Sequence, residues 1–286
     1  MKTIQWFPGH MAKARREATE KINLVDIVIE LVDARLPESS RNPIINEIIG
    51  NKPRIIVLNK MDMADGAITD YWLNYYQSKG IRAMAIDAQH NKGLKQLQTQ
   101  CREIMQPYFD KKMAQGVKPR AIRLIILGIP NVGKSTLINR FVGKNQAQTG
   151  NKPGVTKAQR WLKFEKDFEL LDTPGILWPK FEDPQVGLKL AASGAIKDQL
   201  LAIDEITLYV LDFMKQYYPQ RLLERYQLTA SDLDDQSTTD LFIQMTAKFG
   251  YQDDYEQMGQ RILHDFRQLN LGRVSLDRPN EEASHA

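Results

Sequence analysis

The nine residues GIPNVGKST, at positions 128–136, decide the fold of this 286-residue chain. The apolar run IRLIIL (122–127) precedes them, and LINRFVG (137–143), which has the apolar spacing of a helix, follows them. A strand, a GxxxxGKS segment and a helix in this order predict a loop whose backbone N–H groups surround phosphate oxygens. Gly128 and Gly133 would let the backbone wrap in this way. The alternative, an ordinary Gly-rich turn, is disfavoured by the strand and the helix on either side.

Two side chains of this loop have an expected chemical role. The Lys134 ammonium would reach the β and γ phosphates of a nucleotide, where we expect it to be catalytic, and the Ser135 hydroxyl would ligate Mg²⁺. The expected nucleotide contacts of the loop are Asn131, Val132, Gly133, Lys134, Ser135 and Thr136.

Short β-branched apolar runs on both sides of the loop predict a sheet. We expect parallel strands at 25–32, 54–58, 81–86 and 122–127, and a hairpin of two more strands at 160–164 and 168–171. After about residue 183 the strand pattern ends, and helical periodicity appears at 184–194, 203–217, 238–249 and 254–270. The polar segment 231–239 and the tail after Pro279 are expected to be loops or disordered.

The segment NKMD, residues 59–62, follows a predicted strand, at the end of a parallel sheet where α/β proteins bind ligands. The Asp62 carboxylate can accept hydrogen bonds from N1–H and the exocyclic amino group of guanine, whereas adenine would leave a buried carboxylate unpaired. Asn59 and Lys60 would support the loop and flank the base. On its own Asn-Lys-x-Asp is usually a turn, but beside a phosphate loop it predicts a guanine site.

Two further elements complete the set expected for GTP. The segment DTPG (172–175) closes the second hairpin strand, so that Asp172 can hold Mg²⁺ through water and the Gly175 N–H can contact the γ-phosphate. Thr156 lies between the phosphate loop and this strand, where a switch threonine would complete the Mg²⁺ shell; a plain loop hydroxyl is the alternative. The expected Mg²⁺ ligands are Ser135, Thr156 and Asp172.

The guanine segment precedes the phosphate loop, whereas the common GTPase order places it after the DxxG segment. The sequence therefore predicts the α/β class: a circularly permuted P-loop GTPase domain with a parallel-dominated sheet and an N-terminal basic segment at 1–180. An all-helical domain, expected to bind RNA, would follow at 181–286. Because the linker at 176–183 is short, the nucleotide state could reposition the helical domain directly.

Two positions depart from the common GTPase pattern. Asp87 precedes Ala88 where many GTPases have Ser-Ala, although the Ala88 N–H can still meet guanine O6. Ile176 stands where many GTPases place the glutamine that orients the attacking water, so another polar group must enter the site or a partner must supply one. His10, in the segment WFPGHMAKARRE (5–16), has a loop setting beside a basic helix start; a surface or packing histidine is the alternative.

Charge and composition narrow the class of protein. Residues 1–180 carry 29 Lys and Arg against 17 Asp and Glu, a net charge of +12, and residues 181–286 carry 10 against 18, a net charge of −8. The basic part makes a polyanion such as RNA a plausible partner. The single cysteine, Cys101, allows neither an internal disulfide nor a zinc cluster, which fits a cytoplasmic protein. With no run near the ~20 apolar residues of a membrane span and no long heptad pattern, we expect a monomer without stable membrane association.

Taken together, NKMD, GIPNVGKST, DTPGI and WFPGHMAKARRE resemble the bacterial ribosome biogenesis GTPase A family, and the similarity extends to LGRVSL at 271–276. The resemblance implies GTP hydrolysis during late maturation of the large (50S) ribosomal subunit, stimulated by the precursor particle, with the helical domain on its rRNA. Members of this family have a hydrophobic residue at the position of Ile176, in place of the catalytic glutamine. The resemblance therefore implies that His10 orients the attacking water. It also implies GTP or GDP and Mg²⁺ as cofactors and, through Asn131, K⁺ as a further candidate.

Two parts of the sequence are candidates for the face that would bind RNA. A net charge of −8 does not favour the helical half, although Arg261, His264 and Arg267 lie opposite an apolar stripe of the 254–270 helix. These three residues form either an RNA contact or a solvated face, and the basic residues at 13–16 are an equal candidate.

Two other functions fit the same motifs. One is a GTP-dependent binding switch for a protein or membrane partner, in which hydrolysis only times release. The other is a small-subunit assembly GTPase with the same permutation, which the lack of zinc-binding cysteines disfavours.

Overall fold

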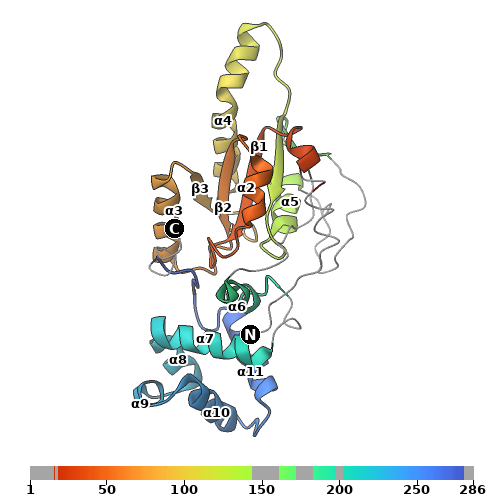
Figure 1. The fold of residues 1–286 in the computed structure, drawn as a ribbon. Helices are drawn as coiled ribbons and strands as arrows, with labels where there is room; N and C mark the ends of the chain where they lie inside the picture. The colour runs from red at the N-terminus through yellow and green to blue at the C-terminus, as the bar shows by residue number, and fades with distance from the viewer. Residues whose placement is uncertain (1–15, 17–18, 144–160, 172–182, 197–201, 280–286) are drawn as a thin grey trace. The chain divides into compact units, whose positions relative to one another are not determined.

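The structure is a computed structural model that describes residues 16, 19–143, 161–171, 183–196 and 202–279 (Figure 1). The chain divides into two compact units. The sheet unit comprises Gln5–Lys180 together with Asp277–Ala286, and the helical unit is formed mainly by Phe181–Leu276. Among the helices that the structure describes, none is both long and apolar enough to cross a membrane.

Six strands form one sheet in the order β3-β2-β1-β4-β6-β5. They are β1 (Ile27–Asp33), β2 (Arg54–Asn59), β3 (Arg82–Ala85), β4 (Ile122–Leu127), β5 (Trp161–Phe164) and β6 (Phe168–Leu171). Every neighbouring pair is parallel except β5 and β6, which form the predicted antiparallel hairpin. The predicted α/β class with a parallel-dominated sheet is therefore confirmed, and the strand positions agree with the apolar runs of the sequence.

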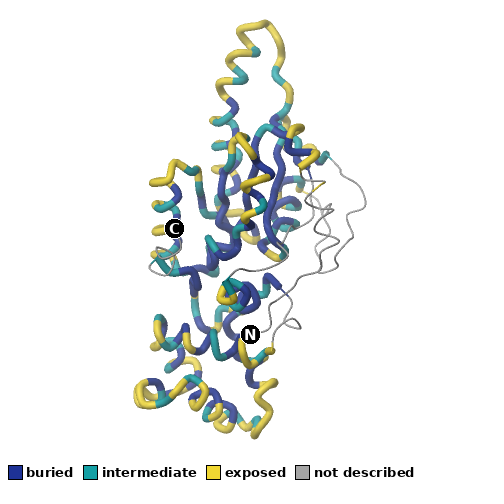
Figure 2. Tube along the Cα trace, viewed as in Figure 1, coloured by how far each residue is buried: buried dark blue, intermediate teal, exposed yellow. Residues whose placement is uncertain are grey.

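Helices cover both faces of this sheet. They are α2 (Pro43–Ile49), α3 (Gly66–Ser78), α4 (Leu94–Ala114) and α5 (Lys134–Val142). Strand β1 is buried along its whole length. Val28 belongs to a core cluster with Ile45 of α2, and Val32 belongs to one with Trp72 of α3, so both helices lie on the same face. The alternate β1 residues point to the other face, which α4 and α5 cover, and Figure 2 shows the sheet as the buried centre of the unit.

The helical unit is built around α7. Its helices are α6 (Pro184–Ala192), α7 (Ile203–Tyr217), α8 (Pro219–Tyr226), α9 (Ala230–Asp234), α10 (Thr238–Lys248) and α11 (Tyr255–Arg267). Helix α7 contacts α6, α8, α10 and α11. At Gly259 a Cβ atom would lie 2.7 Å from Ile203 Cγ2, which shows how closely α11 approaches α7.

The four predicted helices of this half are confirmed, and two short ones were not predicted. Helix α8 begins at Pro219, whose missing backbone N–H is not needed in the first turn of a helix. Helix α9 lies partly inside the polar segment 231–239, which was expected to be a loop. A reciprocal capping box between Thr229 and Asp232 begins this helix, so the cap-forming residues there start a helix as well as a turn.

Helix α11 presents less free positive charge than its sequence indicates. The Arg267 guanidinium donates to the carbonyl oxygens of Ala192 (3.0 Å) and Ala191 (2.7 Å) at the end of α6. Arg261 lies over the ring of Phe249, 4.3 Å from its centroid. Two of the three basic residues proposed as an RNA-binding face are thus engaged within the helical unit.

Candidate nucleotide-binding site

The carboxyl ends of four neighbouring strands bring the predicted motifs to one edge of the sheet. Strands β3, β2, β1 and β4 are parallel and adjacent, so the residues that follow them meet. The phosphate loop follows β4, the segment NKMD begins at the last residue of β2, and the Asp87–Ala88 loop follows β3. Strand β1 ends in Asp33, which lies opposite Asn59 in the register of the sheet.

The phosphate loop leads directly into helix α5. The helix begins at Lys134, and its N-cap residue Gly133 has a left-handed backbone with φ 100°. The N–H groups at the start of this helix and the helix dipole favour an anion. The Lys134 side chain is buried and donates to the carbonyl oxygens of Gly128 (3.0 Å) and Ile129 (2.6 Å). The ammonium therefore lies inside the loop that it is expected to serve.

Both glycines of the loop are required by close approach. A Cβ atom on Gly128 would lie 2.4 Å from the carbonyl oxygen of Leu31 in β1. A Cβ atom on Gly133 would lie 2.2 Å from Asn59 Nδ2. The phosphate loop and the guanine segment thus touch at a point where a side chain does not fit.

Asn59 joins three motifs with one amide. Its Nδ2 donates to the carbonyl oxygen of Val132 in the phosphate loop (2.8 Å), and its Oδ1 accepts from the Ala88 N–H (3.0 Å). Asn59, Val132 and Ala88 are all buried. Because one side chain positions both loops, the site is assembled by hydrogen bonds as well as by the sheet.

Lys60 makes a second link between the guanine segment and the phosphate loop. Its ammonium donates to the carbonyl oxygen of Asn131 (2.7 Å) and to Asp33 Oδ2 (2.9 Å). Lys60 and Asn131 both have a left-handed backbone, with φ values of 64° and 61°. Such strained conformations in non-glycine residues often occur at functional sites.

Asp33 and Arg35 form a buried ion pair beside this link, with a distance of 2.8 Å between Arg35 Nη2 and Asp33 Oδ2. Burial alone would raise the pKa of Asp33, but the charges and hydrogen bonds of Arg35 and Lys60 outweigh it and hold that pKa well below its usual range. Neither Asp33 nor Arg35 was predicted from the sequence. The position of Asp33 at the end of an apolar strand, at the edge where ligands bind, is the pattern that could have indicated it.

Asp62 lies beside the second guanine loop. Carboxylate oxygens of Asp62 and Asp87 and a ring nitrogen of His90 lie within 4.8 Å of one another. Asp87 is buried and accepts from the His90 N–H (3.0 Å), and its other oxygen lies 2.7 Å from His90 Nδ1. Arg140 of α5 donates to the carbonyl oxygens of Ala88 (3.2 Å) and Gln89 (2.6 Å). Asp87, which stands where many GTPases have serine, therefore supports the second guanine loop. Arg140, which was not predicted, supports the same loop from helix α5.

The remaining predicted residues divide into two groups. Ser135 and Thr136 are half-buried in the first turn of α5, next to Lys134. His10, Thr156, Asp172 and Gly175 lie outside the described residues. Within the described part of the chain, the structure brings the guanine loops and the phosphate loop together through Asn59 and Lys60.

A permuted order of motifs on a parallel sheet, with a phosphate loop tied to an Asn-Lys-x-Asp segment, defines a circularly permuted P-loop GTPase. Comparison with known proteins gives the same class. Residues 123–245 match a family described as 50S ribosome-binding GTPase. Two solved structures, GDP-bound TM YlqF and GNP-bound YlqF from T. maritima, are each 25% identical in sequence to this chain. Their TM-scores against it are 0.65 and 0.61. Each comparison covers 93% of this chain, and 100% and 98% of the respective solved chain.

Curated relatives identify the family. Ribosome biogenesis GTPase A of Priestia megaterium is 53% identical to this chain over an alignment of 285 residues. The alignment covers 98% of this chain and 98% of the relative. The protein of the same name from Bacillus cereus is 52% identical and covers 97% of this chain and 95% of its own. The chain belongs to the ribosome biogenesis GTPase A family and is a GTP hydrolase that acts in ribosome biogenesis.

Proposed function

We propose that this GTPase acts in late maturation of the large (50S) ribosomal subunit and that the precursor particle stimulates its hydrolysis of GTP. The observation that supports the GTP-binding part of the proposal is the direct hydrogen bonding of Asn59 and Lys60 to the phosphate loop, at Val132 and Asn131. A base-recognition segment and a phosphate loop held together in this way suit one guanine nucleotide. The description of the matching family as 50S ribosome-binding supports the choice of particle.

Guanine recognition is assigned to the loops after β2 and β3. The Asp62 carboxylate would accept from N1–H and the exocyclic amino group of the base, and the Ala88 N–H would donate to O6. Asn59 holds Ala88 in place and Lys60 would flank the base.

Phosphate binding is assigned to the loop before α5, from Asn131 to Thr136. The N–H groups at the start of α5 would bind the phosphate oxygens, and Lys134 would exchange its loop carbonyl partners for the β and γ phosphates. The half-buried Ser135 hydroxyl beside the loop fits Mg²⁺, which prefers oxygen ligands, with Thr156 and Asp172 as the other proposed ligands. The ion would neutralise charge between the two phosphates.

Hydrolysis needs a group that orients the attacking water, and we assign this role to His10. Ile176 has no polar atom in its side chain, so it cannot hold a water molecule. Lys134 and the Gly175 N–H would stabilise the charge that develops on the γ-phosphate. Asn131 is the proposed contact for K⁺, which would add positive charge at the same place.

The proposal includes the setting in which the enzyme works. It would act in the cytoplasm as a monomer, with the domain at 1–180 hydrolysing GTP and the helical domain at 181–286 contacting the rRNA of the precursor. A change of nucleotide would alter the linker between these domains and so time the release of the particle.

Nucleotide-dependent binding tests this function. The purified chain, loaded with a non-hydrolysable GTP analogue or with GDP, is sedimented with large subunits, with small subunits and with anionic lipid vesicles at several salt concentrations. We expect co-sedimentation with large subunits that is stronger in the GTP-analogue state and weaker at high salt. Equal binding in both nucleotide states would contradict the proposal. Preference for small subunits would indicate the small-subunit alternative, and preference for vesicles would indicate the membrane switch.

A further inference from the structure

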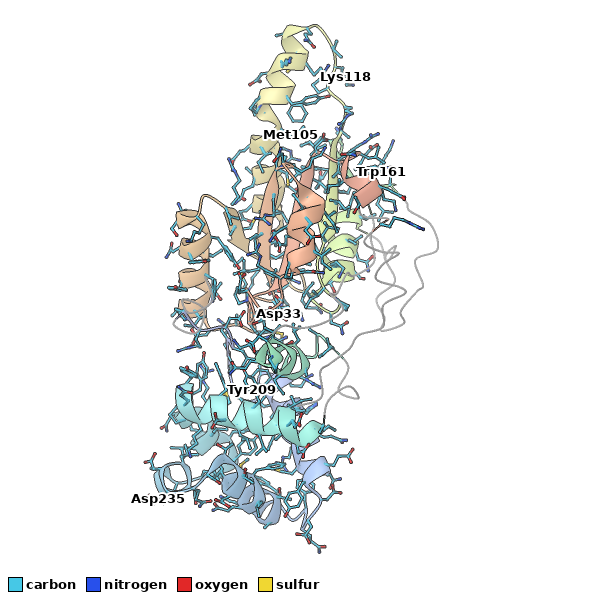
Figure 3. All side chains as sticks on the ribbon, viewed as in Figure 1. Asp33, Met105, Lys118, Trp161, Tyr209 and Asp235 are labelled. Carbon is cyan, nitrogen blue, oxygen red and sulfur yellow. The ribbon has the colours of Figure 1, made fainter. Side chains whose placement is uncertain are left out.

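The far end of helix α4 extends beyond the sheet that its first half covers (Figure 1). Leu94, Leu97, Cys101 and Met105 form its buried stripe, but the residues after Met105 have no strand to cover. The segment 108–120, here called the finger, comprises the last two turns of α4 and the return to β4. Figure 2 shows it as largely exposed, and Figure 3 labels Lys118 on it, beyond Met105.

The finger is internally braced. Tyr108 lies under two cations, with the Arg120 guanidinium 5.8 Å and the Lys112 ammonium 6.0 Å from the ring centroid. Arg120 in turn makes two hydrogen bonds to the Asp26 carboxylate, of 2.7 and 2.8 Å, just before β1. These contacts fix the return segment against the helix and join both to the sheet.

The tip of the finger is a defined turn. The Val117 N–H donates to the carbonyl oxygen of Lys112 (3.0 Å), and the Gly116 N–H donates to that of Met113 (2.9 Å). With Gly116 at a φ of 68°, this is the Schellman pattern that ends many helices. The turn therefore gives the backbone of the tip a defined conformation.

The charge of the finger is strongly positive. Its 13 residues contain four basic residues and one acidic residue, Asp110, a net charge of +3. Arg120 is balanced by Asp26, but the ion pairs among the described residues include none with Lys111, Lys112 or Lys118. Lys111 and Lys118 are exposed and Lys112 is half-buried, so the finger presents three ammonium groups at one end of the sheet unit.

We propose that the finger is a docking element for RNA, with Lys111, Lys112 and Lys118 contacting backbone phosphates and Met113 at the tip lying against the bases or sugars. The inference rests on the proposed function, because it assumes that the partner is a ribosomal particle. Lysines without an ion pair to a described acidic residue, on a braced projection, match a polyphosphate chain. Met113 is 68% exposed, the highest value among the large apolar side chains that the structure describes as exposed.

The position of the finger is compatible with this role. The finger enters the amino end of β4, whereas the phosphate loop leaves the carboxyl end of the same strand. RNA bound to the finger would therefore leave the nucleotide site open. The same β4 strand and α4 helix, which starts beside the second guanine loop, connect the two ends of the unit rigidly.

A salt titration tests the proposal. The chain is bound to purified large subunits, and to rRNA extracted from them, at several salt concentrations in the GTP-analogue state. The triple variant Lys111→Ala/Lys112→Ala/Lys118→Ala is compared with Lys79→Ala/Lys95→Ala/Lys163→Ala, which removes three exposed lysines elsewhere on the sheet unit. We expect the finger variant to bind both probes about tenfold to 100-fold more weakly at 0.1 M salt, with a slope of log K against log salt smaller by about 2. The control variant should behave like wild type.

Each other result has a distinct meaning. If wild type binds subunits and the finger variant matches it in affinity and slope, the finger proposal is wrong and the proposed function stands. If Met113→Ser/Val117→Ser weakens binding to subunits but not to extracted rRNA, while the lysine variant has no effect, the finger contacts a ribosomal protein instead. If wild type binds neither probe, the proposed function and the finger proposal fail together.

Discussion

The carboxylate of Asp277 accepts hydrogen bonds from the backbone N–H of Ser39 (2.7 Å) and from the Ser39 hydroxyl (2.5 Å), across 238 residues of sequence. The Glu38 N–H donates to the same carboxylate (2.9 Å), and Asp277 is fully buried. The chain therefore returns to the sheet unit after the helical unit and is fastened there, beside the turn that follows β1.

Removal of this carboxylate should destabilise the protein. Asp277→Ala would leave the buried N–H group of Ser39 and the partly buried N–H group of Glu38 without their acceptor, which should cost about 2–4 kcal/mol of unfolding free energy. Asp253→Ala, which removes an exposed carboxylate, should change it by less than about 0.5 kcal/mol. Urea unfolding followed by tryptophan fluorescence measures both values. Equal stability of the two variants would show that the hydrogen bonds of the Asp277 carboxylate do not stabilise the fold.

Base specificity should depend on Asp62. An amide at this position can donate to a carbonyl oxygen, so Asp62→Asn should lose affinity for GDP by at least about 100-fold and gain affinity for XDP, which has an oxygen at C2. Fluorescent nucleotide titrations measure both affinities. If the affinities for GDP and XDP fall to the same extent, Asp62 supports the loop but does not bind the base.

Gly133 should be irreplaceable for nucleotide binding. Gly133→Ala would place a Cβ atom 2.2 Å from Asn59 Nδ2 at a positive φ, so the guanine and phosphate loops must separate, and GDP affinity should fall by at least about 100-fold. Gly143 also has a positive φ, but no atom of the described residues lies within 4 Å of its Cβ position. Gly143→Ala should therefore cost only about 1–2 kcal/mol of stability and keep its GDP affinity. Similar affinities in the two variants would contradict the steric argument.

The buried ion pair at Asp33 should make stability depend on pH in the acid range. Because the pKa of Asp33 is lower in the folded than in the unfolded state, its contribution is complete above the unfolded value of about 3.9 and is lost as pH falls toward the folded value. Asp33→Asn should cost about 3–5 kcal/mol at pH 7, since it leaves Arg35 buried without its partner. The difference from wild type should be constant from pH 8 to about pH 5 and shrink below about pH 4, as measured by urea unfolding. A difference that grows on acidification would refute this.

Much of the fold could be predicted because local patterns and tertiary structure agree. The β-branched runs became buried parallel strands, and the motifs at their carboxyl ends met because adjacent parallel strands end at one edge. Lys134 and Asp62 could be selected from spacing alone. Their chemistry requires a particular residue type at a particular distance from a strand.

The interactions that were missed depend on long-range contacts. Nothing near Asp277 indicates that it will accept hydrogen bonds from Ser39, and nothing near Arg140 indicates its bonds to the loop after β3. The boundaries at 180 and 181 were drawn from composition, which does not reveal that the chain returns to the sheet unit at Asp277. The finger was missed because apolar periodicity in α4 continues to Tyr108, beyond the sheet, where only the structure shows that the strands have ended.

The central claim is that a large-subunit particle stimulates hydrolysis through His10, and its most direct test is the rate of GTP hydrolysis with and without purified large subunits. The rates of wild type and His10→Ala are compared in potassium and in sodium buffer, with small subunits as the control particle. We expect large subunits to accelerate wild type by at least about tenfold, while His10→Ala binds the subunits but hydrolyses GTP about 100-fold more slowly. If large subunits leave the wild-type rate unchanged, the claim that the particle stimulates hydrolysis is wrong. If large subunits accelerate His10→Ala as much as wild type, a group other than His10 orients the attacking water.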